Sequence, residues 1–369
     1  MKVGILTFHR SQNYGALLQA YGLQTFLEGL GHKVSMVDYW PDYHKDMYRV
    51  FSWSIFKRMS FLAKVRYLIY SVGTFYRTIK RQKSTNDFIV EYLHVSTEKK
   101  FDAVIYGSDQ IWRKYFKNDW GDFNPVYWGN QYVDAPLKIA YAASMGEIIV
   151  ENGKDRNFII KHLSNFDAIS IREKDLVEYF EKEFGEKYQL VCDPVFLLNR
   201  EQWEKMVNHK QIPPQKYILY YRLQNLKYTD DIVKELSNKT GYSVIETRGY
   251  VPLFHYSQRY KFTISAQEFV SLVSGAEYIV TSAFHGIAMS IIFNKQFYYA
   301  SQKKQANRVD SLLSKLGIND RTINTSSFFK EQLNSIDYNS VNLKLIEWEQ
   351  ESKDWLCNIL NSRFESNNH

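Results

Sequence analysis

The residue in this 369-residue chain best suited to acid–base chemistry is His285, in the run Thr281–Gly286. This run follows a short apolar segment and opens an apolar helical stretch, so we expect His285 at the amino end of a helix. That end carries partial positive charge and favours an anion such as phosphate. Ser282 and Gly286 flank the histidine. The sequence therefore predicts a proton-transferring histidine beside an anion, with a purely structural histidine as the alternative.

A second candidate is Arg172, which follows the apolar run 168–171. An arginine that follows a strand end and reaches into a cleft is suited to form bidentate hydrogen bonds with a carboxylate or phosphate. The alternative is an ion pair with a nearby acid such as Glu173 or Asp193.

Two further polar loops follow apolar runs. His9–Gly15 opens a helix, and Gly107–Trp112 combines a glycine, which permits close backbone approach, with Asp109, which suits a sugar hydroxyl. Helix capping is the alternative for both loops. Neither has the spacing of a dinucleotide or P-loop motif, which disfavours NAD and P-loop chemistry.

Downstream, the basic run 303–308 precedes a helical pattern and contains Lys303 and Arg308. It is placed to close over an anionic ligand, and a solvated loop is the alternative. No metal-ligand spacing occurs among the nine histidines and two cysteines, so we expect no metal site.

The elements that must position these residues alternate between strand and helix, which predicts parallel sheets covered on both faces. We expect an α/β protein of two Rossmann-like domains with an interdomain cleft. The predicted boundaries are 1–198 for the first domain, 199–338 for the second, and 339–369 for a C-terminal helix that packs back on the first. Expected strands are 3–8, 33–38, 103–106, 138–143, 168–171, 189–192, 217–221, 242–246, 278–281 and 296–299; expected helices are 15–30, 156–163, 174–184, 230–239, 266–274, 285–293, 309–316 and 341–360.

Composition fits a soluble globular protein, with 45% apolar and 24% charged residues. Two cysteines exclude a disulfide scaffold, and neither a secretory signal nor a spanning segment is evident. We therefore expect a cytoplasmic protein.

The net charge of +7 is concentrated in an insertion, 44–98, which we expect to be helical. Between Lys45 and Lys83 there are ten Lys/Arg, one acid (Asp46) and nine aromatic residues. Such a segment suits peripheral contact with the anionic inner face of a membrane. The alternative is a solvated basic helix pair that packs its aromatics into the domain. No nucleic-acid-binding module is present.

Seven motifs in order resemble the polysaccharide pyruvyltransferase family over about residues 1–320. They are NYGALLQAYGLQ (13–24), GSDQIW (107–112), AYAAS (140–144), SIREK (170–174), CDPVFLL (192–198), TSAFHG (281–286) and NRVDSLLSKLGI (307–318). The resemblance implies a fold similar to GT-B glycosyltransferases.

The resemblance also implies an activity: transfer of pyruvate from phosphoenolpyruvate, as a cyclic ketal, to a sugar of a cell-surface polysaccharide or its lipid-linked precursor. No metal or redox cofactor is implied. The residues implied are His285 and Arg172 for catalysis; Arg172, Ser282, His285, Gly286, Arg308 and Lys303 for the donor; and Asn13, Tyr14, Gly15, Asp109, Gln110 and Ser144 for the acceptor.

One position departs from the family pattern. Many relatives have arginine two places before the histidine, where this chain has Ala283. Either Arg308, Lys303 or Arg10 supplies that charge, or the donor differs.

Two other classes of function compete with this one. A glycosyltransferase that uses a nucleotide sugar would rely on a carboxylate base, Asp109 or Glu173, more than on His285. A non-catalytic scaffold for surface-glycan assembly would need neither Arg172 nor His285.

Overall fold

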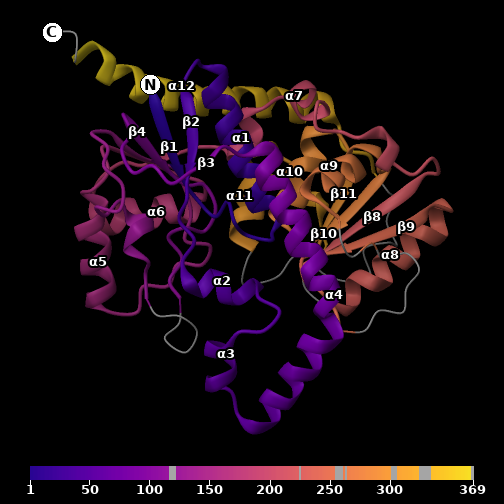
Figure 1. Ribbon diagram of the computed structural model, residues 1–369. Coiled ribbons are helices and arrows are strands. Elements are labelled where there is room, and N and C mark those ends of the chain that lie inside the picture. The colour runs from indigo at the N-terminus through magenta and orange to yellow at the C-terminus, as the bar shows by residue number, and fades with distance from the viewer. Residues whose placement is uncertain are drawn as a thin grey trace.

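The computed structural model describes residues 1–115, 122–223, 226–253, 261, 264–300, 306–323 and 334–366, with the side chains of 227, 306, 307 and 363–366 left out. Two parallel sheets flanked by helices form the body of the molecule (Figure 1). The predicted α/β fold with two Rossmann-like sheets is confirmed.

The first sheet has seven strands in the order β3-β2-β1-β4-β5-β6-β7, and every pairing is parallel. Its strands are β1 Lys2–Leu6, β2 Lys33–Val37, β3 Val95–Ser96, β4 Ala103–Tyr106, β5 Lys138–Ala143, β6 Ala168–Ile171 and β7 Gln189–Leu190. All of β4 and most of β1 and β5 are buried, because helices cover both faces of a parallel sheet. Strand order reverses between β1 and β4, where β2 lies on one side and β5 on the other.

The second sheet has five parallel strands in the order β12-β11-β10-β8-β9. Its strands are β8 Tyr217–Arg222, β9 Ser243–Arg248, β10 Tyr278–Thr281, β11 Gln296–Ala300 and β12 Thr322–Ile323. Here the order reverses between β8 and β10. Ligands of such sheets bind beyond the carboxyl ends of the strands at these reversal points.

The helices of the described residues lie around and between the two sheets (Figure 1). They are α1 Tyr14–Gly29, α2 Asp42–Tyr48, α3 Trp53–Arg58, α4 Phe61–Tyr92, α5 Gly153–Leu163, α6 Lys174–Phe184, α7 Arg200–Glu204, α8 Lys227–Thr240, α9 Ala266–Gly275, α10 Phe284–Ile292, α11 Ala306–Leu316 and α12 Tyr338–Ser366. None of the helices within these described ranges is long and apolar enough to span a membrane.

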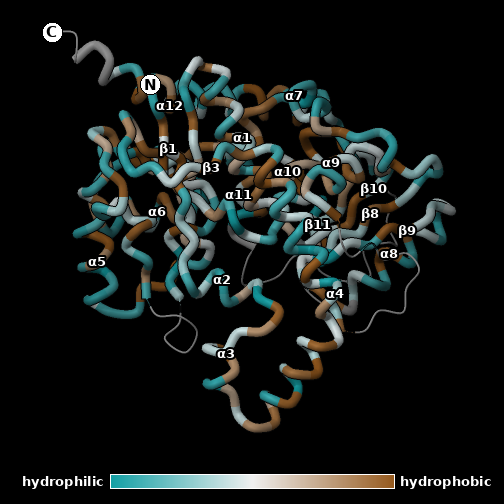
Figure 2. Tube along the Cα trace, in the orientation of Figure 1, coloured by the Kyte–Doolittle hydropathy of each residue, from teal (hydrophilic) through white to brown (hydrophobic). Residues whose placement is uncertain are grey.

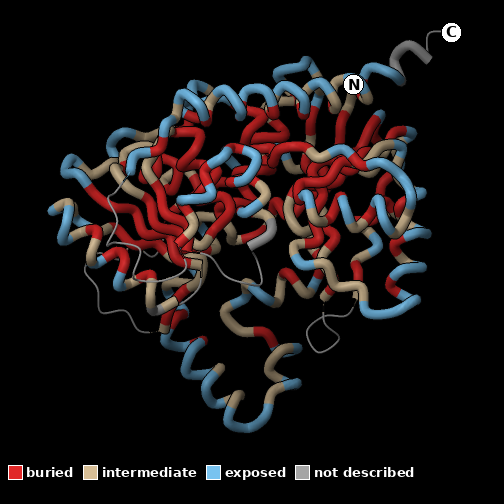
Figure 3. Tube along the Cα trace, turned by 180° about the vertical axis from the view of Figure 1, so that it is seen from behind, coloured by how far each residue is buried: buried red, intermediate tan, exposed pale blue. Residues whose placement is uncertain are grey.

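A continuous apolar core joins the two sheets through α1, α9 and α10. The ring of Tyr14, at the start of α1, stacks on Phe269 of α9 with centroids 5.1 Å apart and lies 5.6 Å from Tyr221 of β8. Figure 3 shows the buried chain running through both halves of the molecule. This shared core holds the strand ends of one sheet at a fixed distance from those of the other.

Helix α12 crosses from the second sheet to the first. Near its start, Tyr338 donates a hydrogen bond to the Lys295 carbonyl, next to β11. Farther along, the Ser352 hydroxyl accepts a hydrogen bond of 3.0 Å from the Cys192 amide. The helix therefore contacts both halves of the chain.

The 32-residue helix α4 also bridges the two halves. The guanidinium of its buried Arg81 donates to the Gln12 carbonyl at 2.9 Å and to the Arg248 carbonyl at 3.2 Å, one in each half. The same guanidinium lies 5.7 Å from the centre of the Tyr14 ring. Arg81 thus links α4 to the loops at the ends of β1 and β9.

We predict that Arg81→Met lowers the free energy of unfolding by about 2–3 kcal/mol, because two partly buried carbonyls lose a charged donor. Urea denaturation measures the change. The control is Lys83→Met, an exposed change on the same helix that should stay within about 0.5 kcal/mol of the original protein. Equal stability of the two variants would contradict the bridging role of Arg81.

Candidate active site

A hollow of about 230 Å³ lies where the reversal points of the two sheets face each other. From the first half it is lined by the loops after β1 and β4 and by α2; from the second half, by the ends of β8 and β10 and by Arg308. The residues that line it are Phe8, Ser11, Asn13, His44, Met47, Tyr48, Asp109, Gln110, Arg113, Tyr115, Tyr221, Leu223, Ala283, Phe284, His285 and Arg308. The hollow occupies the position at which such folds bind ligands.

His285 lies in the first turn of α10 and packs against the first turn of α1. A methyl group on Gly15 would come within 2.0 Å of the His285 Nδ1 atom, so only glycine permits this approach. Asn13 caps α1 by accepting a 3.0 Å hydrogen bond from the Gly15 amide. Two helix amino ends thus converge beside the hollow, and both favour a bound anion.

A buried carboxylate, that of Asp193, lies behind His285. One oxygen, Oδ2, is 2.6 Å from Arg172 Nη1 and 3.4 Å from His285 Nε2. The contact to His285 has ion-pair distance but not hydrogen-bond alignment, so the Nε2 atom keeps no hydrogen-bond partner. Burial alone would raise the pKa of Asp193, but the charges of His285 and Arg172 hold that pKa well below its usual range.

The Ser108 hydroxyl completes this cluster. It accepts a 3.1 Å hydrogen bond from Arg172 and donates one of 3.2 Å to Asp193. The other Asp193 oxygen accepts a 3.1 Å hydrogen bond from the Val195 amide. Asp193 is therefore fixed from three sides, and its orientation toward His285 is fixed with it.

Arg172 forms the ion pair that the sequence left open as an alternative. Besides Asp193, its guanidinium lies 3.5 Å from a Glu173 oxygen and 5.1 Å from the centre of the Phe284 ring. Its side chain is only 1% exposed. In this arrangement Arg172 supports the Asp193–His285 pair from behind and does not line the hollow.

Ser144, predicted to contact an acceptor, is also buried. Its hydroxyl donates to Glu173 and accepts a 3.0 Å hydrogen bond from the Gly146 amide. Burial raises the pKa of Glu173 despite the opposing charges of Arg172 and Arg308. Ser144 thus fixes a carboxyl group beside Arg172.

Arg308 is the cation that does line the hollow. With its amide oxygen turned toward the guanidinium, Gln110 accepts from the two terminal nitrogens of Arg308 at 2.6 and 2.9 Å. The Arg308 Nε atom is buried without a hydrogen-bond partner. Burial and the nearby charge of Arg172 lower the pKa of Arg308 from its usual value. An anion in the hollow would offset the charge that the two guanidinium groups place close together.

The other predicted residues are placed as follows. Asn13, Asp109 and Gln110 line the hollow, and Asp109 adopts a left-handed backbone conformation with φ of 70°. Tyr14 is buried in the contact between the two halves, where its hydroxyl lies 3.5 Å from that of Thr247.

The remaining predicted donor residues lie at or near the start of α10. Ser282 is half-buried, and Gly286 packs against the Thr281 side chain so closely that a Cβ would come within 2.8 Å. Arg10, a candidate replacement for the missing arginine, is paired with Asp38 at 2.7 Å. Lys303 lies outside the described residues.

Several residues of the site carry little signal in the sequence. From the sequence, Asp193 is only an alternative partner of Arg172, although an acid directly after a predicted strand is a signal that could single it out. Helix α2 contributes His44, whose Nε2 lies 2.9 Å from the Tyr115 hydroxyl and whose pKa burial lowers to about 4. No spacing in the sequence links α2 to the strand ends.

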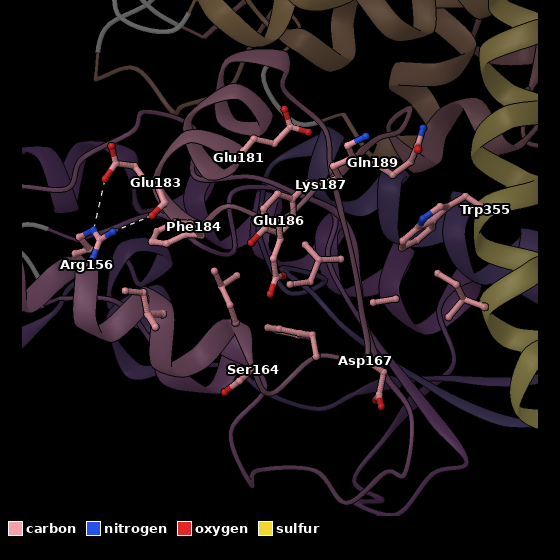
Figure 4. A pocket seen from close by; sticks show the side chains of 17 residues that line it. Arg156, Ser164, Asp167, Glu181, Glu183, Phe184, Glu186, Lys187, Gln189 and Trp355 are labelled. Carbon is pink, nitrogen blue, oxygen red and sulfur yellow. Dashed lines mark hydrogen bonds and ion pairs between the residues drawn. The ribbon is translucent and has the colours of Figure 1, made fainter.

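Figure 4 shows a second hollow, of about 940 Å³, between α5, α6 and α12. It lies at the amino ends of β6 and β7, whereas ligands of parallel sheets bind at the carboxyl ends. Its Arg156 is already paired with Glu183 at 3.5 Å. Within the described part of the chain, no three His, Cys, Asp or Glu side chains gather as a metal site.

Comparison with known proteins identifies one family. The model of the polysaccharide pyruvyl transferase family matches residues 13–302. This range includes Asn13, Arg172, Asp193 and His285 and ends before Arg308. No curated protein matches the sequence.

Solved structures resemble the fold at low sequence identity. A Listeria monocytogenes protein described as a UDP-N-acetylglucosamine 2-epimerase superposes with a TM-score of 0.51 and 9% identity, over 99% of this chain and 97% of its own. The UDP-GlcNAc 2-epimerase of Methanocaldococcus jannaschii superposes with a TM-score of 0.47 and 12% identity, over 98% of this chain and 100% of its own. The glycosyltransferase SnogD of Streptomyces nogalater superposes with a TM-score of 0.44 and 9% identity, over 96% of this chain and 95% of its own. The similarity to the Listeria protein and the two parallel sheets confirm the GT-B-like fold.

We predict that Asp193→Asn lowers the free energy of unfolding by about 3 kcal/mol at pH 7, because it leaves the buried Arg172 without its closest carboxylate. The pKa of Asp193 is depressed in the folded state, so its stabilisation is present above the unfolded pKa of about 4 and is lost as the pH falls below it. The difference between the two proteins should therefore shrink in acid.

Urea denaturation between pH 7 and pH 3 measures this difference. Glu204→Gln, which removes the half-exposed partner of Arg200, is the control and should change stability by less than about 1 kcal/mol. A difference between Asp193→Asn and the original protein that stays constant with pH would contradict the assignment.

Proposed function

The chain belongs to the polysaccharide pyruvyl transferase family, and from this premise we propose that it transfers pyruvate from phosphoenolpyruvate to a sugar as a cyclic ketal. The acceptor sugar belongs to a cell-surface polysaccharide or to its lipid-linked precursor. The observation that carries the proposal is His285, held in the cleft between a buried Asp193 carboxylate and the amino end of α1, with Arg308 beside it.

Arg308 and the two helix amino ends would hold the donor. Phosphoenolpyruvate has a phosphate and a carboxylate, and it needs cationic groups that are shielded from water. Arg308 supplies a guanidinium to the hollow, and the amides at the starts of α1 and α10 add partial positive charge. Arg308 thereby supplies the positive charge of the arginine that many relatives have at the position of Ala283.

His285 would move the protons. Protonation of the donor's methylene carbon by the imidazolium leaves positive charge at the neighbouring carbon, which the first sugar hydroxyl attacks. That hydroxyl passes its proton to the imidazole, and the phosphate then leaves with the C–O bonding pair. The second hydroxyl attacks the same carbon and passes its proton to the departing phosphate, which closes the ketal. The sum is a diol plus phosphoenolpyruvate giving a ketal plus inorganic phosphate.

Arg172 and Asp193 would act as positioning residues in this scheme. The Asp193 carboxylate faces the edge of His285 that carries Nε2 and offsets the charge of the protonated ring. Arg172 and Ser108 hold that carboxylate in place. The acceptor would contact Asn13, Asp109 and Gln110, which line the same hollow as His285 and present hydroxyl-binding groups.

Calorimetric titration with phosphoenolpyruvate tests the donor site. We expect saturable binding that weakens about 30-fold or more in Arg308→Met, since loss of a buried charged contact costs about 2–5 kcal/mol. His285→Gln should retain binding within a few-fold, because its role is in proton transfer. Arg200→Met, an exposed arginine on α7, is the matched control and should bind as the original protein does.

UDP-, CMP- and GDP-sugars provide the contrast in the same titration. Saturable binding of a nucleotide sugar, with no binding of phosphoenolpyruvate alone or with added glycosides, would overturn the proposal in favour of a glycosyltransferase. Unchanged phosphoenolpyruvate affinity in Arg308→Met would remove Arg308 from the donor site.

A further inference from the structure

Helices α3 and α4 form a projection, residues 53–79, that extends from the body of the molecule on the side away from α12 (Figures 1 and 3). Figure 2 shows apolar segments along it. Large apolar side chains are exposed over its whole length, with Phe61 at 79% and Leu62 at 71% directly after the turn between the two helices. The exposed set is Trp53, Phe61, Leu62, Val65, Leu68, Ile69, Tyr70, Val72, Phe75, Tyr76 and Ile79.

The sequence left open that this segment is a solvated helix pair that packs its aromatic side chains into the domain, and the exposed side chains show that this alternative is partly wrong. Its aromatics do not all pack into the domain. Phe51, Phe56 and Tyr67 pack on one another, with Phe51 5.2 Å from Phe56 and 5.5 Å from Tyr67 between ring centroids. Trp53 and Phe61 remain exposed. The small inner cluster holds α3 against α4 and leaves the outer side chains facing solvent.

The projection is fixed to the body at its base. The Tyr70 hydroxyl donates to the Val251 carbonyl at 2.7 Å, and the Arg77 guanidinium donates to the Leu253 carbonyl at 2.9 Å. Within the projecting segment, the Ser52 amide donates to the Tyr67 hydroxyl at 2.8 Å, which ties the start of α3 to α4. The exposed apolar surface is thus preformed and needs no folding to bind.

The projection lies within a longer segment, residues 45–83, that has a strong excess of positive charge. Ten Lys/Arg and one acid lie between Lys45 and Lys83, a local charge of +9. Arg81 is buried within the protein and Arg49 is paired with Asp46. Exposed basic side chains accompany the apolar ones along α3 and α4: Lys57, Arg58, Arg66, Lys80 and Lys83.

We propose that this projection docks the protein on the surface of an anionic lipid bilayer. Apolar and aromatic side chains interspersed with Lys and Arg on an exposed helix suit the interface, where the rings enter the headgroup region and the cations meet lipid phosphates. The helix lies on the bilayer and does not cross it, since none of the described helices meets the requirements for spanning.

Charge favours a bilayer over a second copy of the chain. In a two-fold dimer the same surface would face itself, which would bring together two projections that each have five Lys/Arg and no acid between residues 53 and 79. An anionic bilayer neutralises that charge. The docking itself does not depend on the proposed function. Only one consequence of docking rests on that function, namely that a lipid-linked acceptor would be brought close to the hollow. Helix α2, which precedes the projection, lines the hollow with His44, Met47 and Tyr48.

Co-sedimentation of the full chain with vesicles tests the docking without any turnover. We expect binding to vesicles of about 70% phosphatidylcholine and 30% phosphatidylglycerol, weak binding to phosphatidylcholine alone, and a marked loss of binding in about 0.5 M NaCl. Lys57→Glu with Arg66→Glu should lower the partition coefficient roughly tenfold or more. Phe61→Ser with Leu62→Ser should lower it to a similar extent.

Two double variants on other surfaces serve as controls. Leu343→Ser with Ile346→Ser removes apolar side chains of 71% and 61% exposure from α12, and Lys205→Glu with Lys210→Glu reverses two exposed lysines. Both should bind vesicles as the original protein does, and circular dichroism should show that all variants fold.

Equal binding to neutral and anionic vesicles, binding unaffected by salt, no binding at all, or equal losses in the control variants would each overturn the proposal. So would analytical ultracentrifugation without vesicles if it shows a dimer that Phe61→Ser with Leu62→Ser dissociates, since the apolar surface would then belong to self-association.

Discussion

The buried carboxylate of Asp193 is the group on which the arrangement of the cleft depends. It neutralises the guanidinium of Arg172 at 2.6 Å, accepts a hydrogen bond from the Ser108 hydroxyl and faces the His285 ring at 3.4 Å. A charge this deeply buried is tolerated only where it is paired and hydrogen-bonded. The pairing therefore orders three loops, those after β4, β6 and β7, and fixes the surroundings of a histidine that belongs to the other half of the chain.

A second constraint is the way the two sheets meet. Each has one point at which strand order reverses, and α1, α9 and α10 pack between the sheets so that these points face each other. Gly15 lets α1 approach His285 more closely than any side chain would allow. Because the core between the halves is continuous, the cleft is preformed. Its anion-favouring features, two helix amino ends and Arg308, come from different parts of the sequence.

Much of the fold could be predicted because strands buried on both faces are continuous apolar runs. β4, β5, β6, β10 and α6 have the predicted boundaries. The edge strands β3 and β12, at two residues each, are too short to leave a pattern. His285, Asp109 and Gln110 could be predicted for the cleft because each follows an apolar run that forms a strand, and ligands bind beyond the carboxyl ends of parallel strands.

The rest of the site depended on tertiary contacts. Sequence alone could not decide between a ligand and Asp193 as the partner of Arg172, because both are anions. It also could not show that Ser144 and Tyr14 are buried, or that α2 lines the hollow. For α3 and α4, composition indicated basic aromatic helices, but which aromatics face solvent follows from how Phe51, Phe56 and Tyr67 pack together.

In the proposed reaction, the histidine held against α1 performs the proton transfer. Phosphate release from phosphoenolpyruvate, measured with a panel of glycosides that have free neighbouring hydroxyls, tests this claim in Gly15→Ala and Gly29→Ala. The methyl group of Gly15→Ala would meet His285 Nδ1 at 2.0 Å, whereas that of Gly29→Ala, on the same helix, has nothing within 4 Å. We predict glycoside-dependent release that Gly29→Ala retains and Gly15→Ala loses by 100-fold or more (~3 kcal/mol in the barrier). Equal rates in the two variants would contradict the account.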